Sequence, residues 1–97
     1  MSALWISHVR VSDAEAFGRY AKLAGPAIAD HGGVFLARGT PHLTLEGPGA
    51  DRHVVIRFPS LAAAEACYRS PAYQAALAHA VSASDRHLVI VEENPAT

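Results

Sequence analysis

The order of strand-like and helix-like segments is the feature that most constrains the fold of this chain. Runs of apolar and β-branched residues predict four strands and a shorter fifth one. They lie at residues 3–11, 34–38, 42–46 (the short one), 53–58 and 87–92. Apolar residues at helical spacing predict one helix after the first strand and another after residue 60. The predicted order is therefore strand, helix, strand, short strand, strand, helix, strand.

Local signals mark where the two helical regions begin and break. Ser12-Asp13-Ala14-Glu15 is a capping-box pattern, in which the Ser12 hydroxyl and the Glu15 carboxylate satisfy amides of the first turn. Gly25-Pro26 predicts a bend or a restart, because proline lacks the amide and crowds the preceding turn. The glycines after His31 end this helix. Ser70-Pro71 predicts a break in the second helical region, which runs from residue 61 to about 80.

Two β-α-β halves of this length fit an α+β class, a ferredoxin-like βαββαβ subunit whose antiparallel sheet carries both helices on one face. With 97 residues the chain is expected to be a single domain spanning residues 1–97. The other face of the sheet is left uncovered. Because so short a chain buries little surface, we expect a second copy to cover that face. The predicted assembly is a homodimer, paired through the sheet face as a dimeric α/β barrel.

Charge and cysteine content exclude several classes of function. The formal net charge is −1, so the basic field that attracts nucleic acid is missing. No apolar run approaches the length of a membrane span, and no basic segment precedes the apolar start of the chain. The lone Cys67 cannot form an internal disulfide and is interpreted as a small buried hydrophobe. We expect a cytoplasmic protein with no nucleic-acid and no membrane partner.

Five segments carry a family resemblance and keep their order along the chain. They are HGGVFLARG at 31–39, LEG at 45–47, VVIRFPS at 54–60, YRSPAYQ at 68–74 and LVIVEE at 88–93. Together they resemble the family catalogued as domain of unknown function 1330. The resemblance implies a ferredoxin-like subunit of the dimeric α/β-barrel superfamily. Relatives in that superfamily include small monooxygenases, dye-decolorising peroxidases, muconolactone isomerase and stress-responsive barrel proteins.

Strand alternation suggests a polar site on the sheet. His8, Arg38 and Arg57 each end an apolar row on their strand, as Arg38 does after Val34 and Leu36. If these rows are adjacent, the three groups converge on an anionic or carbonyl group, with arginine as donor and histidine as general acid or base. The alternative is that they emerge at the rim of the sheet or pair with acidic side chains. The candidate partners are Glu46, Asp51 and Glu92.

Aromatic residues complete the candidate site. The hydroxyls of Tyr20, Tyr68 and Tyr73 are placed to line a crevice between sheet and helices, and the alternative is that these rings only pack in the core. Trp5 fits either the core of a dimer or the wall of a pocket. The predicted catalytic residues are His8 and Arg38. The predicted substrate-binding residues are Trp5, Tyr20, Arg57, Tyr68 and Tyr73.

No cofactor or metal is predicted. The six histidines are scattered, and none of them pairs with another at the i, i+3 or i, i+4 spacing of a helical metal site. No glycine-rich loop leads from a strand into a helix, as nucleotide binding would require. Metal binding through the histidines is kept as a third interpretation.

Two functional hypotheses follow, and whether the protein is an enzyme stays open between them. In the first, it is a cofactor-independent enzyme or binder of a small aromatic or carbonyl-bearing metabolite, held in a pocket of the dimeric barrel. In the second, it is a non-catalytic dimeric structural or stress-linked interaction module. Analogy with the superfamily favours the first, although fold alone does not determine function.

Overall fold

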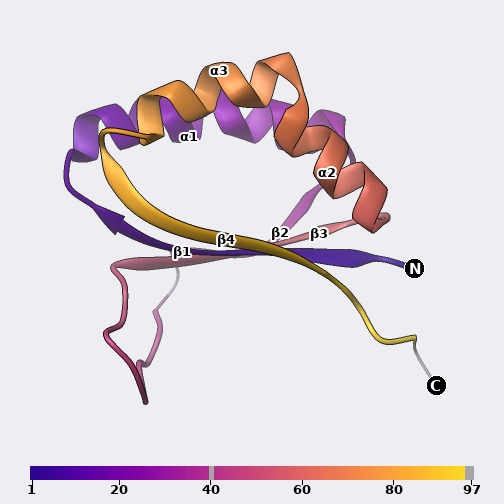
Figure 1. The fold of residues 1–97 in the computed structure, drawn as a ribbon, viewed down its shortest axis with the longest axis horizontal. Coiled ribbons are helices and arrows are strands. Elements are labelled where there is room, and N and C mark those ends of the chain that lie inside the picture. Colours follow the sequence, from indigo (N-terminus) through magenta and orange to yellow (C-terminus); the bar gives the residue numbers. More distant parts are fainter. Residues whose placement is uncertain (40, 96–97) are drawn as a thin grey trace.

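A computed structural model describes residues 1–39 and 41–95 of the chain. Within them lie four strands and three helices. They are β1 (Ala3–Val11), α1 (Ala14–Asp30), β2 (Val34–Arg38), β3 (Arg52–Phe58), α2 (Leu61–Arg69), α3 (Pro71–Ala80) and β4 (Ser84–Glu92). The strands form one antiparallel sheet in the order β2-β3-β1-β4, and the helices cover one of its faces (Figure 1). This arrangement confirms the predicted ferredoxin-like α+β fold.

The helix signals are confirmed in part. The side chain of Asp13, not of Ser12, caps α1 by accepting a hydrogen bond from the Ala16 amide at 3.1 Å, so the capping-box assignment is wrong. Helix α1 also continues through Pro26, which lies one turn before its end and so removes little of its hydrogen bonding. The predicted break at Ser70 is confirmed, since the Ser70 hydroxyl accepts from the Tyr73 amide and donates to the Cys67 carbonyl.

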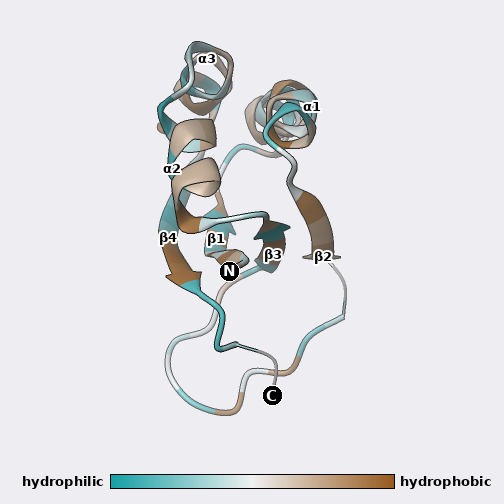
Figure 2. Cartoon of the chain, turned by 90° about the vertical axis from the view of Figure 1, so that its right-hand side faces the viewer, coloured by the Kyte–Doolittle hydropathy of each residue, from teal (hydrophilic) through white to brown (hydrophobic). Residues whose placement is uncertain are grey.

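The predicted short strand at 42–46 is wrong. These residues belong to a loop, residues 41–51, that extends from the sheet on the side away from the helices (Figures 1 and 2). Leu43 and Leu45 are 80% and 82% exposed. Arg10 holds the loop near its C-terminal end, where the Arg10 Nη2 donates to the carbonyls of Pro48 at 2.9 Å and Gly49 at 2.6 Å. Prolines and glycines at both ends of the segment favour this irregular path over pairing.

The hydrophobic core fills the space between the sheet and the helices. The strands contribute Trp5 and Phe58, and the helices contribute Ile28 and Tyr73 together with several buried alanines. The small alanine side chains let α2 approach the sheet and let α3 pack closely along α1. Trp5 is 1% exposed and lies in this core, so its predicted alternative place in a dimer core is wrong.

The opposite face of the sheet is open and largely apolar. Residues directly opposite one another in a sheet share a face. Ile6 stands opposite Val55 of β3 and Val89 of β4. Leu4 and Val34 both stand opposite Arg57, two residues from Val55 along β3, so they lie on the same face. Val34 and Val89 are 60% and 57% exposed. We call this surface the open face.

Two glycines differ in whether a methyl group has room. At Gly33 an added Cβ would lie 2.5 Å from Ile28 Cγ2 and 2.9 Å from the Phe58 ring, whereas at Gly18 in α1 nothing lies within 4 Å. We expect Gly33→Ala to lower the free energy of unfolding by about 1–3 kcal/mol through overpacking. Gly18→Ala should raise it by up to about 1 kcal/mol, because alanine favours the helix. Urea denaturation of both variants checks this, and a loss of stability in both would contradict it.

Candidate functional site

A β-bulge decides where Arg38 lies. The pairing of β2 with β3 shifts between Phe35 and Ala37, so that Arg38 stands opposite Val54 on the helix-covered face. Val34, before the bulge, faces the open side. The extra residue reverses the alternation, since the side-chain period of a strand is two residues. The predicted sharing of one face by Arg38 and Val34 is therefore wrong.

Three arginines line a narrow crevice between the sheet and α1. They are Arg38 of β2, Arg52 of β3 and Arg86 of β4, and the walls include Trp5 and Tyr20. Arg38 Cζ lies 4.2 Å from the centre of the Phe35 ring. The free space in this crevice is about 40 Å³, which is enough for water but not for a metabolite.

A wider groove adjoins the crevice at Arg86. It lies between α3 and β4, has a volume of about 270 Å³, and is lined by Tyr68, Leu77, Leu88 and Arg86 among others. Arg86 lines both the groove and the crevice. A ligand in the groove would therefore reach the same guanidinium that closes the crevice.

Arg86 is held by two tyrosine hydroxyls. Its Nη2 donates to Tyr20 Oη and to Tyr73 Oη, both at 2.9 Å, and the two hydroxyl oxygens are 2.7 Å apart. Arg86 Cζ also lies 4.7 Å from the centre of the Tyr20 ring. Burial raises the pKa of Tyr73 well above its usual value, so this hydroxyl stays neutral.

Counting donors shows that this cluster is incomplete. One tyrosine hydroxyl donates to the other, and both oxygens accept from Arg86, so one phenolic hydrogen remains for a further acceptor. Among the described residues, the buried Nε atoms of Arg86 and Arg52 also have no hydrogen-bond partner. Unused buried donors are costly. A ligand acceptor in the adjoining groove is placed to satisfy the donors of Arg86, whereas the crevice at Arg52 has room only for water.

The charge at this site is uncompensated as well. Ion pairs within residues 1–39 and 41–95 join Arg19 to Glu15, Arg57 to Glu93 and Arg69 to Glu65, and none involves an arginine of the crevice. No acidic side chain in the described part of the chain lines the crevice or the groove. An arginine cluster in a mainly apolar site without a carboxylate favours an anionic ligand.

The structure separates the predicted catalytic residues. His8 lies on the open face, opposite His53 on one side and His87 on the other, whereas Arg38 faces the helices. Arg57 also faces the open side, but it stands opposite Leu4, about 13 Å along the sheet from His8 at strand spacing. Its guanidinium binds Glu93 in a bidentate ion pair, with Nε to Oε1 at 2.7 Å. The predicted convergence of these three groups is not observed.

The predicted aromatic residues do come together. The Trp5 ring centre is 5.1 Å from that of Tyr73 and 6.0 Å from that of Tyr68, and Tyr20 lies 5.9 Å from Tyr73. Trp5 and Tyr20 line the crevice, and Tyr68 lines the groove. These side chains surround the Arg86 site from the core side.

Sequence reasoning missed Arg52 and Arg86. The strands were predicted to begin at residues 53 and 87, but β3 begins at Arg52 and β4 at Ser84. Alternation is the signal that reveals Arg86, because Arg86 is in phase with Leu88 and Ile90, which pack against the core. Extending each strand toward its start would have placed both arginines on the helix-covered face.

Other candidate groups do not form a site. Cys67 is fully buried, and burial raises the pKa of its thiol to about 11, so it is not a nucleophile near neutral pH. Within the described residues, no group of three or more histidine, cysteine or acidic side chains is placed to hold a metal ion. In the same residues, no helix combines the length and apolar character needed to cross a membrane.

Comparison with solved structures supports the fold. RPA0582, a protein of unknown function from Rhodopseudomonas palustris, is 25% identical with a TM-score of 0.79, over 98% of this chain and 84% of that chain. SnoaB, a cofactor-independent oxygenase from Streptomyces nogalater, is 10% identical with a TM-score of 0.65, over 98% and 95%. A dimeric ferredoxin-like protein of unknown function from Bacteroides fragilis is 13% identical with a TM-score of 0.64, over 95% and 96%. The last two show likeness of fold alone.

Comparison of the sequence with protein families gives a direct assignment. A search of the curated proteins finds no match. The family model described as domain of unknown function (DUF1330) matches residues 2–94. Because the match covers nearly the whole chain, the chain belongs to the DUF1330 family.

Proposed function

We propose that the protein binds a small metabolite carrying an anionic oxygen, such as a carboxylate, enolate or phenolate, at Arg86. The observation that carries this proposal is the set of unused donors around Arg86 in a site without acidic residues among those described. Arginine and tyrosine hydroxyls form charge-assisted hydrogen bonds with such oxygens. The aromatic ring of Tyr68 and the apolar side chains of Leu77 and Leu88 in the groove fit a planar aromatic or carbonyl-bearing body.

The same donors suit a cofactor-independent reaction of a substrate that ionises easily. A guanidinium and a neutral hydroxyl stabilise negative charge on an enolate or phenolate oxygen. Neither a carboxylate nor an imidazole of the described residues lines the crevice or the groove, so no side chain there is placed to abstract a proton. Binding, or reaction of a substrate that is already ionised, fits this site better than base catalysis. SnoaB, which shares the fold, is a cofactor-independent oxygenase.

We also propose that the protein is a homodimer paired through the open face. The exposed valines of that face and the exposed leucines of loop 41–51 form an apolar surface that a second copy would bury. The structural neighbour from Bacteroides fragilis is described as dimeric. In such a dimer the helices of both copies lie outside, and the groove at Arg86 stays open to ligands.

The ligand proposal is tested with matched compounds that differ only in charge. Thermal unfolding is followed with aromatic carboxylates and enolisable diketones, each compared with its amide or non-enolisable analogue. At ten times the dissociation constant, an anion that binds at Arg86 should stabilise the protein by about 1.4 kcal/mol, a rise in Tm of about 6–11 °C. Tyr20→Phe, which removes one hydroxyl, should reduce this rise. Equal shifts with the carboxylate and its amide would contradict the proposal, and the absence of a shift with every compound would favour a non-catalytic dimeric module.

A further inference from the structure

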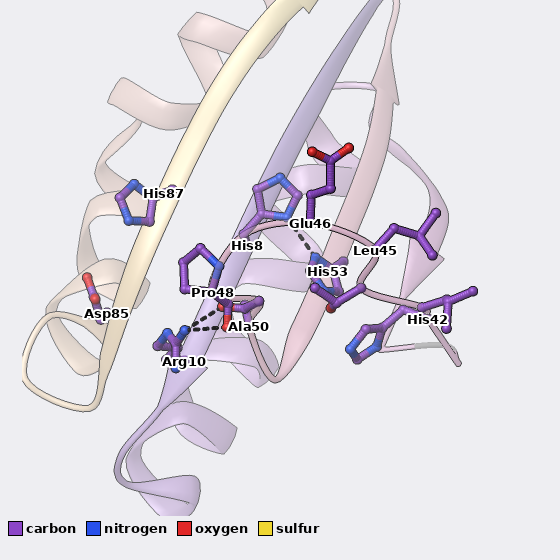
Figure 3. A pocket seen from close by; sticks show the side chains of 13 residues that line it. His8, Arg10, His42, Leu45, Glu46, Pro48, Ala50, His53, Asp85 and His87 are labelled. Atoms are coloured by element: carbon purple, nitrogen blue, oxygen red, sulfur yellow. Dashed lines mark hydrogen bonds between the residues drawn. The ribbon is translucent and has the colours of Figure 1, made fainter.

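A cluster of imidazoles lies on the open face, away from the arginine site. His8 Nδ1 and His53 Nδ1 are 2.7 Å apart, and their ring centres are separated by 4.9 Å (Figure 3). The His42 ring, brought there by loop 41–51, lies 4.4 Å from the His53 ring. We call His8, His42 and His53 the histidine cluster. It lines a pocket of about 510 Å³ between the loop and the sheet.

Charged groups of both signs surround the cluster. From β1 it faces Arg10, and from β4 it faces His87 and Asp85, which stands opposite Arg10 in the register. The loop contributes one carboxylate, Glu46. The Asp51 carboxylate is engaged by the Val11 amide at 2.9 Å. Although carboxylates outnumber Arg10 around this pocket, none of them forms an ion pair with an imidazole of the cluster within the described residues.

This geometry favours neutral imidazoles. A hydrogen bond between two Nδ1 atoms needs one protonated nitrogen and one free lone pair, so it is lost when both rings carry a full set of protons. Burial, followed by the charges of His42 and His8, lowers the pKa of His53 below the usual histidine value. The lowered pKa keeps His53 uncharged at neutral pH, so this ring gains positive charge only in acid.

We propose that association of two copies through the open face is linked to protons by the histidine cluster. This inference rests on the homodimer of the proposed function. The cluster continues the apolar row of Leu4 and Ile6 on β1, so a copy that covers this row also covers the cluster. A two-fold dimer contains the cluster twice. Burying the cluster against the partner further raises the free-energy cost of protonating its imidazoles.

The direction of the pH effect follows from linkage. The dimer holds fewer protons on the cluster than the separated subunits, so association is at full strength above the usual histidine pKa of about 6.5. It weakens as pH falls through the pKa of the cluster in the separated subunit, which for His53 lies below that value. If each subunit must lose one proton, the dissociation constant rises by up to about 100-fold per pH unit on the acid side. Between pH 7.5 and 5.5 we expect at least about a 10-fold increase.

Sedimentation velocity of the full chain at pH 7.5 and 5.5 tests the proposal, with circular dichroism to confirm that the protein stays folded. His53→Gln and His42→Gln each remove a titratable ring from the cluster, and both should reduce the pH dependence of the dissociation constant to about 3-fold or less. His79→Gln on α3 is the matched control and should keep the full pH dependence.

The outcomes separate this proposal from the one on which it rests. A weaker dimer in acid that becomes insensitive to pH in both cluster variants supports it. A dimer of equal strength at both pH values overturns the proton linkage but leaves the homodimer in place, as does a pH effect that persists unchanged in both cluster variants. A monomer at both pH values overturns the homodimer and the linkage together, while ligand binding at Arg86 stands independently.

Discussion

Trp5→Ala is expected to remove about 3–5 kcal/mol of folding free energy, a large part of what a domain of this size has. Trp5 is 1% exposed and lies against the rings of Phe58, Tyr68 and Tyr73, with centre distances of 5.1 to 6.0 Å. Alanine would leave a cavity that two strands and two helices cannot close. Urea denaturation followed by circular dichroism gives the change in the unfolding free energy.

Two further variants calibrate this effect. Trp5→Phe keeps an aromatic ring in the core and should cost less than half as much. Val81→Ala changes a side chain that is 70% exposed and should alter stability by no more than about 0.5 kcal/mol. If Trp5→Ala costs no more than Val81→Ala, then Trp5 does not hold the core between sheet and helices.

Local sequence signals were sufficient to predict most of the helices and strands in their order along the chain. Strand 3–11, strand 34–38 and the break at Ser70 are found as predicted, because each depends on alternation, helical spacing or a capping residue within a few positions. Segment 42–46 alternates in the same way but forms a loop. Alternation alone does not supply a neighbouring strand, and pairing depends on residues far away in the sequence.

The candidate site was predictable only in part, because it depends on register. Trp5, Tyr20, Tyr68 and Tyr73 were found, since residue type and helix or strand phase suffice to place them near a crevice. Arg38 reached the crevice through a bulge that no residue type signals, since the residue at the shift is an ordinary leucine. The bulge thus moved one predicted catalytic residue into the site and separated it from the other.

The histidines illustrate the same limit. His8 and His53 are 45 positions apart, yet the register of β1 with β3 makes them direct neighbours. No local spacing reveals such a pair. The acidic partner of Arg57 was missed for a related reason, since Glu93 lies just beyond the end of β4 while the candidates weighed from sequence included its neighbour Glu92.

Arg86→Met separates a binding role for Arg86 from a structural one. If Arg86 serves the ligand, the protein without ligand carries an unpaired donor and an uncompensated charge, and removing them costs little. We therefore expect the free energy of unfolding to change by no more than about 1 kcal/mol. The affinity for the anionic ligand should fall about 10- to 100-fold, because a charge-assisted hydrogen bond is worth about 1.5–3 kcal/mol. Isothermal titration calorimetry and urea denaturation measure the two quantities on the same variant.

The two roles predict opposite pairs of results. A residue that only joins Tyr20 and Tyr73 would, when replaced, lower stability by several kcal/mol and leave the discrimination between a carboxylate and its amide unchanged. Arg19→Met is the control for loss of a positive charge, since Arg19 is exposed on α1 and pairs only with Glu15 among the described residues. It should change neither quantity appreciably. Equal loss of affinity in both variants would mean that overall charge attracts the anion, and the site at Arg86 would then not be the one that binds it.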